Sequence, residues 1–550
     1  MSVALHDLVP RKLRRTWAAD GSYPDLDLYS LFRARRCQHP HRTALVDNEG
    51  EVSYAELDAL ARQLAAGLAA RGVQAGDVVG IQLPNCRAAV IADLALAALG
   101  AVALPFPAGR GMREAESLLR RSEAVGVLAA AQFRGHHHAT DLAQLLGQLP
   151  TLRFVVSVGI DFAPKSCVPF AELFPGDYDD FVPDRPDPDA AARILVSSGS
   201  ESEPKMVAYS HNALAGGRGN FMASLLTDDR PPRSLFLVPL ATAFGSNGTA
   251  VTLARHGGAL ILLDHFSPRE ALASIQRHRP THVLGVPTMI RMMLENGAAE
   301  TDTSALTALV LGGSQLDATT AREAQQAFGC TVVNLYGSAD GVNCHTDIDE
   351  IDSGEINSDD GTSGVLVGRP DPRVAQIRID RVDTGRTAAP GETGEIVARG
   401  PMTPLCYVGD PQLDSRYRTS DGWVRTGDLG VLDPAGRLHV VGRLKEIVIR
   451  GGANISPTEV ERMLATHPDV RDVACIGVPH DVLGERLAAC VVPRPGSMLD
   501  LEGLCAHLAA NGMERGKHPE SLLLLDALPL TPAGKPDRAA LQTRFTAVRH

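Results

Sequence analysis

Short apolar segments that alternate with amphipathic helices constrain the fold of this chain most. Residues 53–71 place leucine and alanine at helical spacing, and the β-branched segment 77–83 follows directly. A second helix is predicted over 86–99. Such alternation is typical of parallel sheets whose faces are covered by helices. Further segments predicted as strands of this kind lie at 259–263, 282–286 and 308–311.

The length of 550 residues is too great for a single hydrophobic core, so two or more domains are expected. After Gly364 the sequence changes to short strands and Gly/Pro turns. From about Arg443 it has its own pattern of helices (458–466 and 499–510) and strands (470–478 and 487–493). We predict an α/β protein. Its large N-terminal domain, 1–442, has parallel-sheet αβ layers and a β subdomain, and its small, mobile α+β C-terminal domain spans 443–550.

Composition argues against several classes of partner. The net charge of -12 disfavours binding to nucleic acid or to an anionic membrane surface. The nine cysteines have no CxxC spacing, so neither a zinc site nor a disulfide framework is indicated. The most apolar stretch, 88–105, is short and interrupted by Gly100, which disfavours a membrane span. No apolar segment of signal-peptide type follows Arg11–Arg15, so we expect a cytoplasmic protein.

A loop of serine and glycine that ends in lysine lies at 197–205. Hydroxyl and backbone N–H groups in such a loop can surround phosphate oxygens, and a lysine can offset their charge. The loop lacks the paired Lys-Ser/Thr of a P-loop, which disfavours a kinase or a GTPase. Its proposed phosphate-binding residues are Ser197, Ser198, Gly199, Ser200 and Lys205.

Four more segments follow in order along the chain. They are Asn334-Leu335-Tyr336-Gly337-Ser338-Ala339-Asp340, Thr426-Gly427-Asp428, Gly442-Arg443-Leu444-Lys445-Glu446 and Pro532-Ala533-Gly534-Lys535. Each alone is compatible with an ordinary turn. Together, and in this order, they resemble the adenylate-forming superfamily, which includes acyl-CoA synthetases, adenylation domains of peptide synthetases and luciferases. The resemblance covers nearly the whole chain.

The resemblance implies a role for each segment. Tyr336 would pack against adenine, and Asp428 would accept hydrogen bonds from both ribose hydroxyls. Catalytic roles fall to Lys535, which would stabilise charge during attack on the α-phosphorus, and to Asp340, which would ligate Mg²⁺. Lys445 would be the hinge about which the C-terminal domain rotates. The other implied nucleotide-binding residues are the loop residues above with Gly313, Asn334, Gly337 and Arg443.

The chain departs from the family pattern at several positions. Glu201 stands where a hydroxyl residue is usual, and Ser202 and Met206 replace glycines. Carboxylates beside a triphosphate are unfavourable unless they turn outward or share a cation. Asp340 and Ala339 replace the usual glutamate and threonine. Weaker binding of ATP by this loop therefore stays open.

The segment 238–245 corresponds to a family stretch that often reads Pro-Leu-x-His. Here Thr242 takes the place of the histidine, and no nearby aspartate could pair with an α-ammonium group. A buried unpaired cation is costly, so α-amino acids are disfavoured as substrates. The resemblance implies a pocket for a neutral aryl or alkyl carboxylic acid, formed by Thr242, Phe244, Val286, Gly312 and Gly313.

The predicted activity is ATP-dependent activation of such an acid as acyl-AMP, with release of pyrophosphate, followed by transfer to the thiol of CoA. ATP, Mg²⁺ and CoA, or the phosphopantetheine of a carrier protein, are the implied cofactors. Three alternatives stay open: an adenylation enzyme that loads an acyl or peptidyl carrier protein, a diazotase that activates nitrite toward an aryl amine, and a non-catalytic nucleotide-binding relative. Retention of Asp428, Arg443 and Lys535 argues against the last. A homodimer is also left open.

Overall fold

The structure is a computed structural model, and it divides the chain into two compact units. It describes residues 5–159, 164–197, 204–314, 316–346, 364–446, 448–450, 453–480, 484–511, 513, 515–531 and 535–548. The first unit comprises 1–353, 370–377 and 398–425, and the second comprises 354–369, 378–397 and 426–550. Each unit is described by itself.

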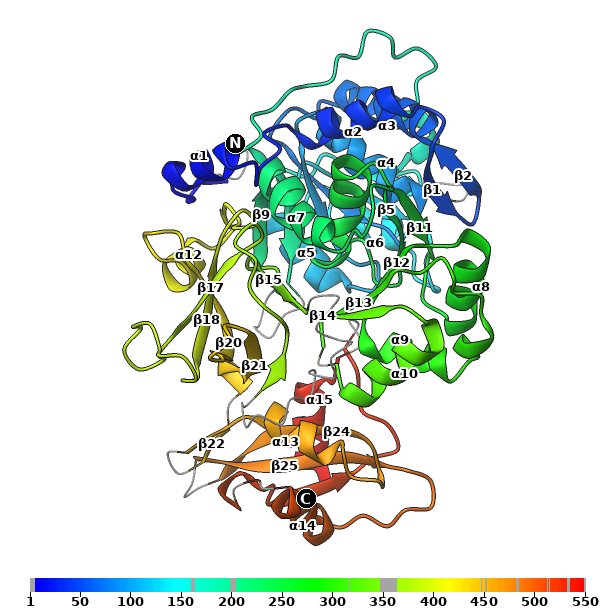
Figure 1. Cartoon of the computed structure of the whole chain (residues 1–550). Helices are drawn as coiled ribbons and strands as arrows, with labels where there is room; N and C mark the ends of the chain where they lie inside the picture. The colour runs from blue at the N-terminus through cyan, green and yellow to red at the C-terminus, as the bar shows by residue number, and fades with distance from the viewer. Residues whose placement is uncertain are drawn as a thin grey trace. The chain divides into compact units, whose positions relative to one another are not determined.

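The described strands of the first unit form two sheets of eight strands each (Figure 1). The first sheet has the order β15-β14-β13-β12-β10-β11-β1-β2. It is parallel in its middle, and the pairs β14–β15 and β1–β2 at its edges are antiparallel. Its strands are β1 (Thr43–Asp47), β2 (Gly50–Ser53), β10 (Arg233–Phe236), β11 (Ala259–Leu262), β12 (His282–Gly285), β13 (Ala308–Gly312), β14 (Thr331–Ser338) and β15 (Val342–His345).

The second sheet of this unit has the order β19-β9-β8-β4-β3-β5-β6-β7. It is parallel except at one edge, where β9 pairs antiparallel with both β8 and β19. Its strands are β3 (Val78–Gln82), β4 (Val102–Pro105), β5 (Gly126–Ala130), β6 (Phe154–Val158), β7 (Val168–Pro169), β8 (Ala191–Val196), β9 (Met206–Ser210) and β19 (Cys406–Tyr407).

Side-chain alternation along the strands explains how this unit is layered. In β3, Val79 and Ile81 join a core that contains residues of α3, α4 and both sheets, whereas Val78 joins a second core with α5 and α6. Because α4 is apolar on nearly all sides, it must be buried on all sides. The helices of this unit are α1 (Arg11–Ala19), α2 (Leu28–Gln38), α3 (Tyr54–Ala70), α4 (Arg87–Ala98), α5 (Met112–Arg121), α6 (His138–Ala143), α7 (Gly219–Ser224), α8 (Pro268–His278), α9 (Pro287–Leu294), α10 (Ala318–Phe328) and α12 (Pro411–Tyr417).

A five-stranded sheet, in the order β16-β21-β20-β18-β17, contributes most of its described residues to the second unit. Its pairs β20–β21 and β16–β21 are antiparallel. This is the β region that the change of texture after Gly364 predicts. Its strands are β16 (Val365–Leu366), β17 (Gln376–Asp380), β18 (Gly394–Arg399), β20 (Val424–Leu432) and β21 (Leu438–Arg443).

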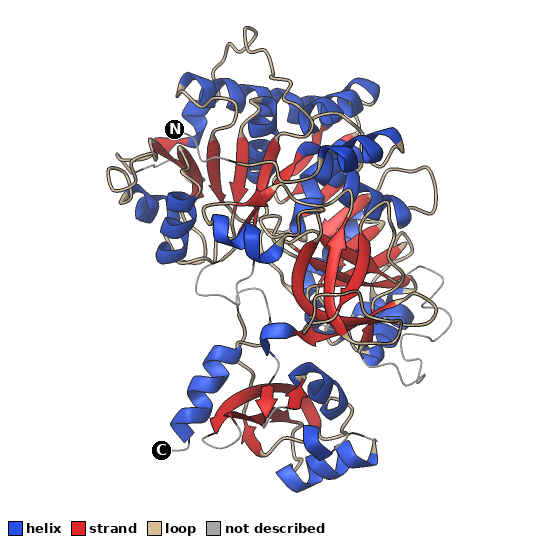
Figure 2. Cartoon of the chain, turned by 90° about the vertical axis from the view of Figure 1, so that its left-hand side faces the viewer, coloured by secondary structure: helices blue, strands red, loops and turns tan. Residues whose placement is uncertain are grey.

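The end of the chain forms another sheet, whose strands and helices Figure 2 shows together. Successive residues of β25 face opposite sides of it. Leu487 and Ala489 pack with α13 and α14, whereas Ala488 and Cys490 pack with α15. The elements are β22 (Val448–Arg450), β23 (Ala453–Ile455), α13 (Pro457–Leu464), β24 (Val470–His480), β25 (Gly484–Pro493), α14 (Leu501–Ala510), β26 (Ser521–Leu524) and α15 (Arg538–Val548).

The predicted α/β class is confirmed, with the parallel layers, the β region and the smaller C-terminal fold in the expected order. The helix predicted over 53–71 spans Tyr54–Ala70, because Ser53 caps it by accepting a hydrogen bond from the Glu56 amide. The boundary between 442 and 443 stays a prediction. No helix among the described residues is long and apolar enough to cross a membrane.

Replacing Leu541 by alanine tests how α15 is held. Leu541 is fully buried against the face of the sheet that carries Ala488 and Cys490. We expect Leu541→Ala to lower the free energy of unfolding by about 2–5 kcal/mol, since a core leucine leaves a cavity. Urea unfolding followed by circular dichroism measures the change. Thr543→Ala, at an exposed position of the same helix, is the control and should change stability by less than about 0.5 kcal/mol. Equal effects of the two changes would contradict this packing.

Candidate functional site

Several predicted site residues follow the carboxyl ends of adjacent parallel strands in the first sheet. Thr242 and Phe244 lie in the loop after β10, and Val286 directly follows β12. Gly312 ends β13. Because β10, β12, β13 and β14 are neighbours in that order, these positions lie along one edge of the sheet. Crevices at this end of parallel strands are the usual ligand sites of open α/β sheets. Three of the residues predicted to bind the nucleotide lie toward the end of β14: Asn334, Tyr336 and Gly337.

Two glycines permit close packing at this edge. A Cβ on Gly312 would lie 2.9 Å from the carbonyl oxygen of Leu335, its partner in the β13–β14 ladder. Gly313 has φ +81°, a conformation that favours glycine. The atom nearest to a Cβ at Gly313 would be Cγ1 of Val286, at 3.6 Å. The predicted pocket residues Val286, Gly312 and Gly313 are therefore neighbours.

The loop predicted to bind phosphate joins the antiparallel strands β8 and β9. Its two ends are closed by hydrogen bonds: the Ser197 amide donates to the Lys205 carbonyl at 2.9 Å, and the Lys205 amide donates to Ser197 Oγ at 3.0 Å. Arg110 donates to the Ser197 carbonyl at 2.8 Å. Ser198, Gly199 and Ser200, with Glu201 and Ser202, lie outside the described residues.

Met206 begins β9 and is fully buried. It packs in the same core as Ile194, Val196 and Ala208. The methionine that replaces a family glycine is therefore a core residue of the strand. Its side chain does not occupy the loop itself.

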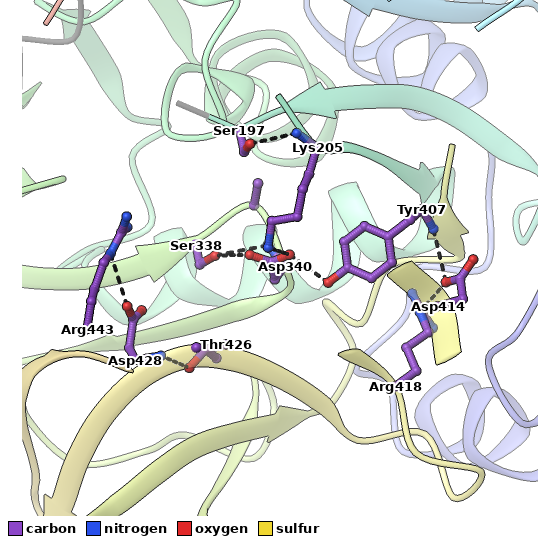
Figure 3. A network of polar contacts seen from close by, with 12 residues as sticks. Ser197, Lys205, Ser338, Asp340, Tyr407, Asp414, Arg418, Thr426, Asp428 and Arg443 are labelled. Carbon is purple, nitrogen blue, oxygen red and sulfur yellow. Dashed lines mark hydrogen bonds and ion pairs between the residues drawn. The ribbon is translucent and has the colours of Figure 1, made fainter. Parts of the chain in front are cut away.

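Lys205, Asp340 and Tyr407 form a buried polar network (Figure 3). Lys205 Nζ lies 2.8 Å from Asp340 Oδ1, and the Tyr407 hydroxyl donates to the same oxygen at 2.7 Å. Ser338 Oγ donates to Oδ2 at 2.7 Å. The side chains of Lys205 and Asp340 are 14% and 6% exposed, so this ion pair is shielded from water. The network connects β9 and β19 of one sheet to the β14–β15 turn of the other.

Aromatic rings and a second ion pair surround the network. Lys205 Nζ lies 4.4 Å from the centroid of the Tyr417 ring, close enough for a cation–π contact. Asp414 accepts a hydrogen bond from the Tyr407 amide at 3.1 Å and pairs with Arg418 at 3.0 Å. Burial, followed by the Asp340 charge, raises the pKa of Tyr407 far above its usual value, so its hydroxyl stays a donor. Burial also raises the pKa of Asp414.

Asp340 fits the predicted role of a magnesium ligand. Among its described contacts, Oδ2 accepts one hydrogen bond, from Ser338, which leaves a second lone pair for a hard cation. Mg²⁺ in nucleotide sites commonly takes one or two carboxylates and completes its shell with phosphate oxygens and water. No cluster of three or more His, Cys, Asp or Glu that could hold a metal is found in the described part of the chain.

In the second unit, Asp428 and Arg443 are partners across the β20–β21 ladder. Arg443 Nε lies 3.2 Å from Asp428 Oδ1, as Figure 3 shows. Gly427 has φ +73°, and Thr426 Oγ1 accepts the Asp428 amide at 3.1 Å while donating to the Ile396 carbonyl at 2.7 Å. The Thr-Gly-Asp turn therefore holds the Asp428 backbone firmly beside Arg443.

Lys535 belongs to the same unit and lies within electrostatic reach of this pair. Burial and then the charge of Arg443 lower its pKa, whereas Asp428 and Glu446 oppose the shift. Its backbone is fixed by Thr531, whose amide donates to the Lys535 carbonyl at 2.7 Å. Three predicted residues from distant segments are thus brought together. Lys445 lies in the short 3-10 turn Leu444–Glu446, and its side chain is outside the described part.

The sequence interpretation missed Tyr407, Tyr417, Ser338 and Arg110. A tyrosine in an apolar segment needs a partner for its hydroxyl, and this was the one signal for Tyr407. Thr242, which was predicted from its position, uses its hydroxyl locally. Its Oγ1 donates to the Pro239 carbonyl at 2.8 Å and accepts the Gly245 amide at 3.0 Å.

Comparison with known proteins shows to which family the chain belongs. The model of the AMP-binding enzyme family matches residues 32–408, and that of the AMP-binding enzyme C-terminal domain matches 459–535. The chain is 31% identical to a 2-hydroxy-7-methoxy-5-methyl-1-naphthoate–CoA ligase of Streptomyces carzinostaticus, covering 92% of this chain and 90% of the relative. It is 31% identical to a salicyl-AMP ligase/salicyl-S-ArCP synthetase of Mycobacterium tuberculosis, covering 97% and 93%.

Among solved structures, the amide bond synthetase McbA from Marinactinospora thermotolerans superposes with a TM-score of 0.82 at 28% identity. The match covers 94% of this chain and 99% of that one. One family model covers both sheets of the first unit, and the other covers the C-terminal fold from residue 459 to Lys535. This chain belongs to the AMP-binding enzyme family, within the adenylate-forming superfamily.

Proposed function

We propose that this protein activates an aryl or alkyl carboxylic acid with ATP, forms acyl-AMP and pyrophosphate, and transfers the acyl group to the thiol of CoA. The observation that carries the proposal is the grouping of Lys535, Arg443 and Asp428 within the second unit, where their charges act on one another. Burial and the charge of Arg443 lower the pKa of Lys535, whereas Asp428 and Glu446 oppose the shift, and such a cluster of charges is suited to binding a phosphate.

In the first half-reaction, an oxygen of the substrate carboxylate attacks the α-phosphorus of ATP. A new O–P bond forms as the bond to the β-phosphate bridging oxygen breaks, and pyrophosphate leaves with the electron pair. The Lys535 ammonium stabilises this developing charge, and its desolvation strengthens the effect. Mg²⁺, held by Asp340, would offset phosphate charge. Asp428 and Arg443 orient the ribose.

In the second half-reaction, the acceptor sulfur attacks the acyl carbon. A C–S bond forms, AMP leaves with the shared oxygen, and the thiol proton is released to solvent. Rotation of the 443–550 segment about Lys445 would switch the protein from the first half-reaction to the second. It would remove Lys535 and present another face of this segment for attack by the thiol.

Two acceptors of the acyl group are compatible with this chemistry. Delivery to a carrier-protein phosphopantetheine is the second candidate, and the relative named as a salicyl-S-ArCP synthetase favours it. Pyrophosphate release measured across a panel of acids, followed by product analysis with CoA or a carrier protein, tests the proposal. Absence of pyrophosphate release with every acid would overturn it.

Lys535→Ala should slow pyrophosphate release strongly. Removing a preorganised charge-stabilising group costs roughly 2–4 kcal/mol of transition-state stabilisation. The variant should still convert a supplied acyl-adenylate to the thioester, because that step does not use the ammonium group. Single-turnover kinetics of each half-reaction provides the measurement, and a variant that releases pyrophosphate at the original rate would exclude this role.

Asp428→Asn should weaken ATP binding by about ten-fold or more, since the neutral amide makes weaker hydrogen bonds to the ribose hydroxyls. The change also removes the charge partner of Arg443. Titration calorimetry with ATP gives the dissociation constant. 2′,3′-dideoxy-ATP provides the matched control, because it should bind the variant and the original protein with a much smaller difference. An equal loss for both nucleotides would contradict the ribose contact.

Tyr407→Phe should weaken the Lys205–Asp340 network without emptying the core. Loss of a hydrogen bond to a charged group costs about 1.5–3 kcal/mol, so we expect a higher Mg²⁺ requirement and slower pyrophosphate release. Tyr29→Phe is the control, because the Tyr29 hydroxyl donates to Asp58 at the same 2.7 Å elsewhere in the unit. It should lower stability alone. Identical kinetic effects of the two variants would make Tyr407 merely structural.

A further inference from the structure

Two arginines, one at each end of helix α5, donate to the two ends of the loop predicted to bind phosphate. Arg110 directly precedes Gly111, the N-cap of α5, and donates through Nη2 to the Ser197 carbonyl at 2.8 Å. Arg121 is the last residue of α5 and donates through Nη1 to the Pro204 carbonyl at 3.0 Å. Ser197 directly follows β8, and Pro204 lies two residues before β9. One helix therefore contacts both ends of the loop.

Arg110 is itself held on two sides. Its carbonyl accepts a hydrogen bond from Nε2 of Gln82, at the end of β3, at 3.0 Å. Its Nη1 pairs with Glu114 in the first turn of α5. The side chain is only 11% exposed, and a hydrogen bond from a charged donor is stronger than one between neutral groups. Arg110 thus ties the first residue of the loop, Ser197, to β3 and α5.

The peptide group between Pro204 and Lys205 is held on both of its edges. The C=O and N–H of a trans peptide point in opposite directions. The Pro204 carbonyl accepts from Arg121, whereas the Lys205 amide donates to Ser197 Oγ at 3.0 Å (Figure 3). The backbone of Arg121 packs closely on Gly409, where a Cβ would lie 2.7 Å from the Arg121 carbonyl oxygen. Both the position and the plane of this peptide are therefore fixed.

These contacts leave Ser197 with one unused polar group. Its amide donates to the Lys205 carbonyl, its carbonyl accepts from Arg110, and its Oγ accepts from the Lys205 amide. A hydroxyl has one hydrogen to donate as well as its lone pairs. In the part of the chain that the structure describes, no acceptor is found for this hydrogen. It can therefore donate to a phosphate oxygen, as the predicted role of Ser197 requires.

We propose that Arg110 and Arg121 are positioning residues for the triphosphate of ATP. Acting through the backbone, they hold Ser197 and Lys205 in one arrangement before the nucleotide binds. The inference rests on the proposed function and deepens it. Donors that are already oriented bind an anionic group without the cost of reorganisation. A contact that merely stabilised the fold would not distinguish a nucleotide from a nucleoside.

Binding of ATP and of adenosine to the full chain separates positioning from a structural role. Arg110→Met and Arg121→Met should each raise the Kd of ATP by about ten-fold or more, because a hydrogen bond from a charged donor is lost. The Kd of adenosine, which has no phosphate, should change little. Arg110→Lys should lose less ATP affinity, since it keeps a charged donor. Titration calorimetry in the presence of Mg²⁺ gives each Kd, and the Tm of each variant reports its folding.

Arg120→Met is the matched control. Arg120 lies in the same helix, is 52% exposed on its side chain and pairs with Glu116. Its replacement removes the same charge without touching the loop, so the Kd of ATP should stay close to the original. A loss of ATP affinity equal to that of Arg121→Met would show that net charge alone matters, and would overturn the proposal.

A double-mutant cycle tests whether Arg110 acts through Ser197. Ser197→Ala removes the hydroxyl and keeps the carbonyl that Arg110 contacts. Arg110→Met should therefore cost much less ATP affinity in the Ser197→Ala background than in the original protein, because residues that act as a unit are not additive. Full multiplication of the two losses would contradict the positioning role.

Three further results would overturn the inference. They are an unchanged Kd of ATP in either methionine variant, equal losses for ATP and adenosine, and a fall in Tm and ATP binding that Arg110→Lys does not reduce. Pyrophosphate release separates this inference from the proposed function. If no acid supports release but the arginine variants lose affinity for ATP alone, the proposed function fails and the positioning role stands. If an acid supports release and a methionine variant binds ATP normally, the positioning role fails alone.

Discussion

The ion pair between Lys205 and Asp340 is the interaction on which the candidate site depends. It joins the beginning of β9, in one sheet, to the β14–β15 turn of the other. Both side chains are nearly buried, and a buried charge left without its partner is strongly destabilising. Tyr407 and Ser338 donate the other hydrogen bonds to this carboxylate, so the end of the loop predicted to bind phosphate is held against the predicted magnesium ligand. The side chains of this network are therefore held in one arrangement by their own hydrogen bonds.

The ion pair of the second unit is more exposed to water than that of the first. Asp428 and Arg443 are paired across a strand ladder, and Arg443 is 41% exposed on its side chain, so this pair is partly hydrated. An ion pair that is partly hydrated contributes little to stability, so its partners are held less firmly than those of a buried pair. Burial, followed by the charge of Arg443, lowers the pKa of Lys535. The fixed pair is thus found in the first unit and the adaptable one in the second.

Much of the fold could be predicted from the sequence. The strands and helices lie where the spacing of apolar residues and the capping residues predict them. α3 begins at Tyr54 since Ser53 is its cap, and the buried strand predicted over 77–83 is β3. The nucleotide-binding residues are a prediction from the order of the motifs along the chain, because no single motif is specific enough to assign them. Tyr407 escaped prediction because its partner, Asp340, lies 67 residues away along the chain. Such partners are set by sheet order and not by any local pattern.

The residues at which the loop predicted to bind phosphate departs from the family pattern have different structural settings. Met206 pairs with Val196 in the β8–β9 ladder and is buried in the core, so its replacement of a glycine changes strand packing and not the loop. The hydrogen bonds between Ser197 and Lys205 close the loop at both ends independently of the residues between them. A glycine at position 206 would empty a core position, whereas methionine fills it. The substitution is therefore expected to strengthen the strand from which Lys205 reaches Asp340, and the electrostatic question in the loop reduces to the carboxylate at Glu201 and its neighbours.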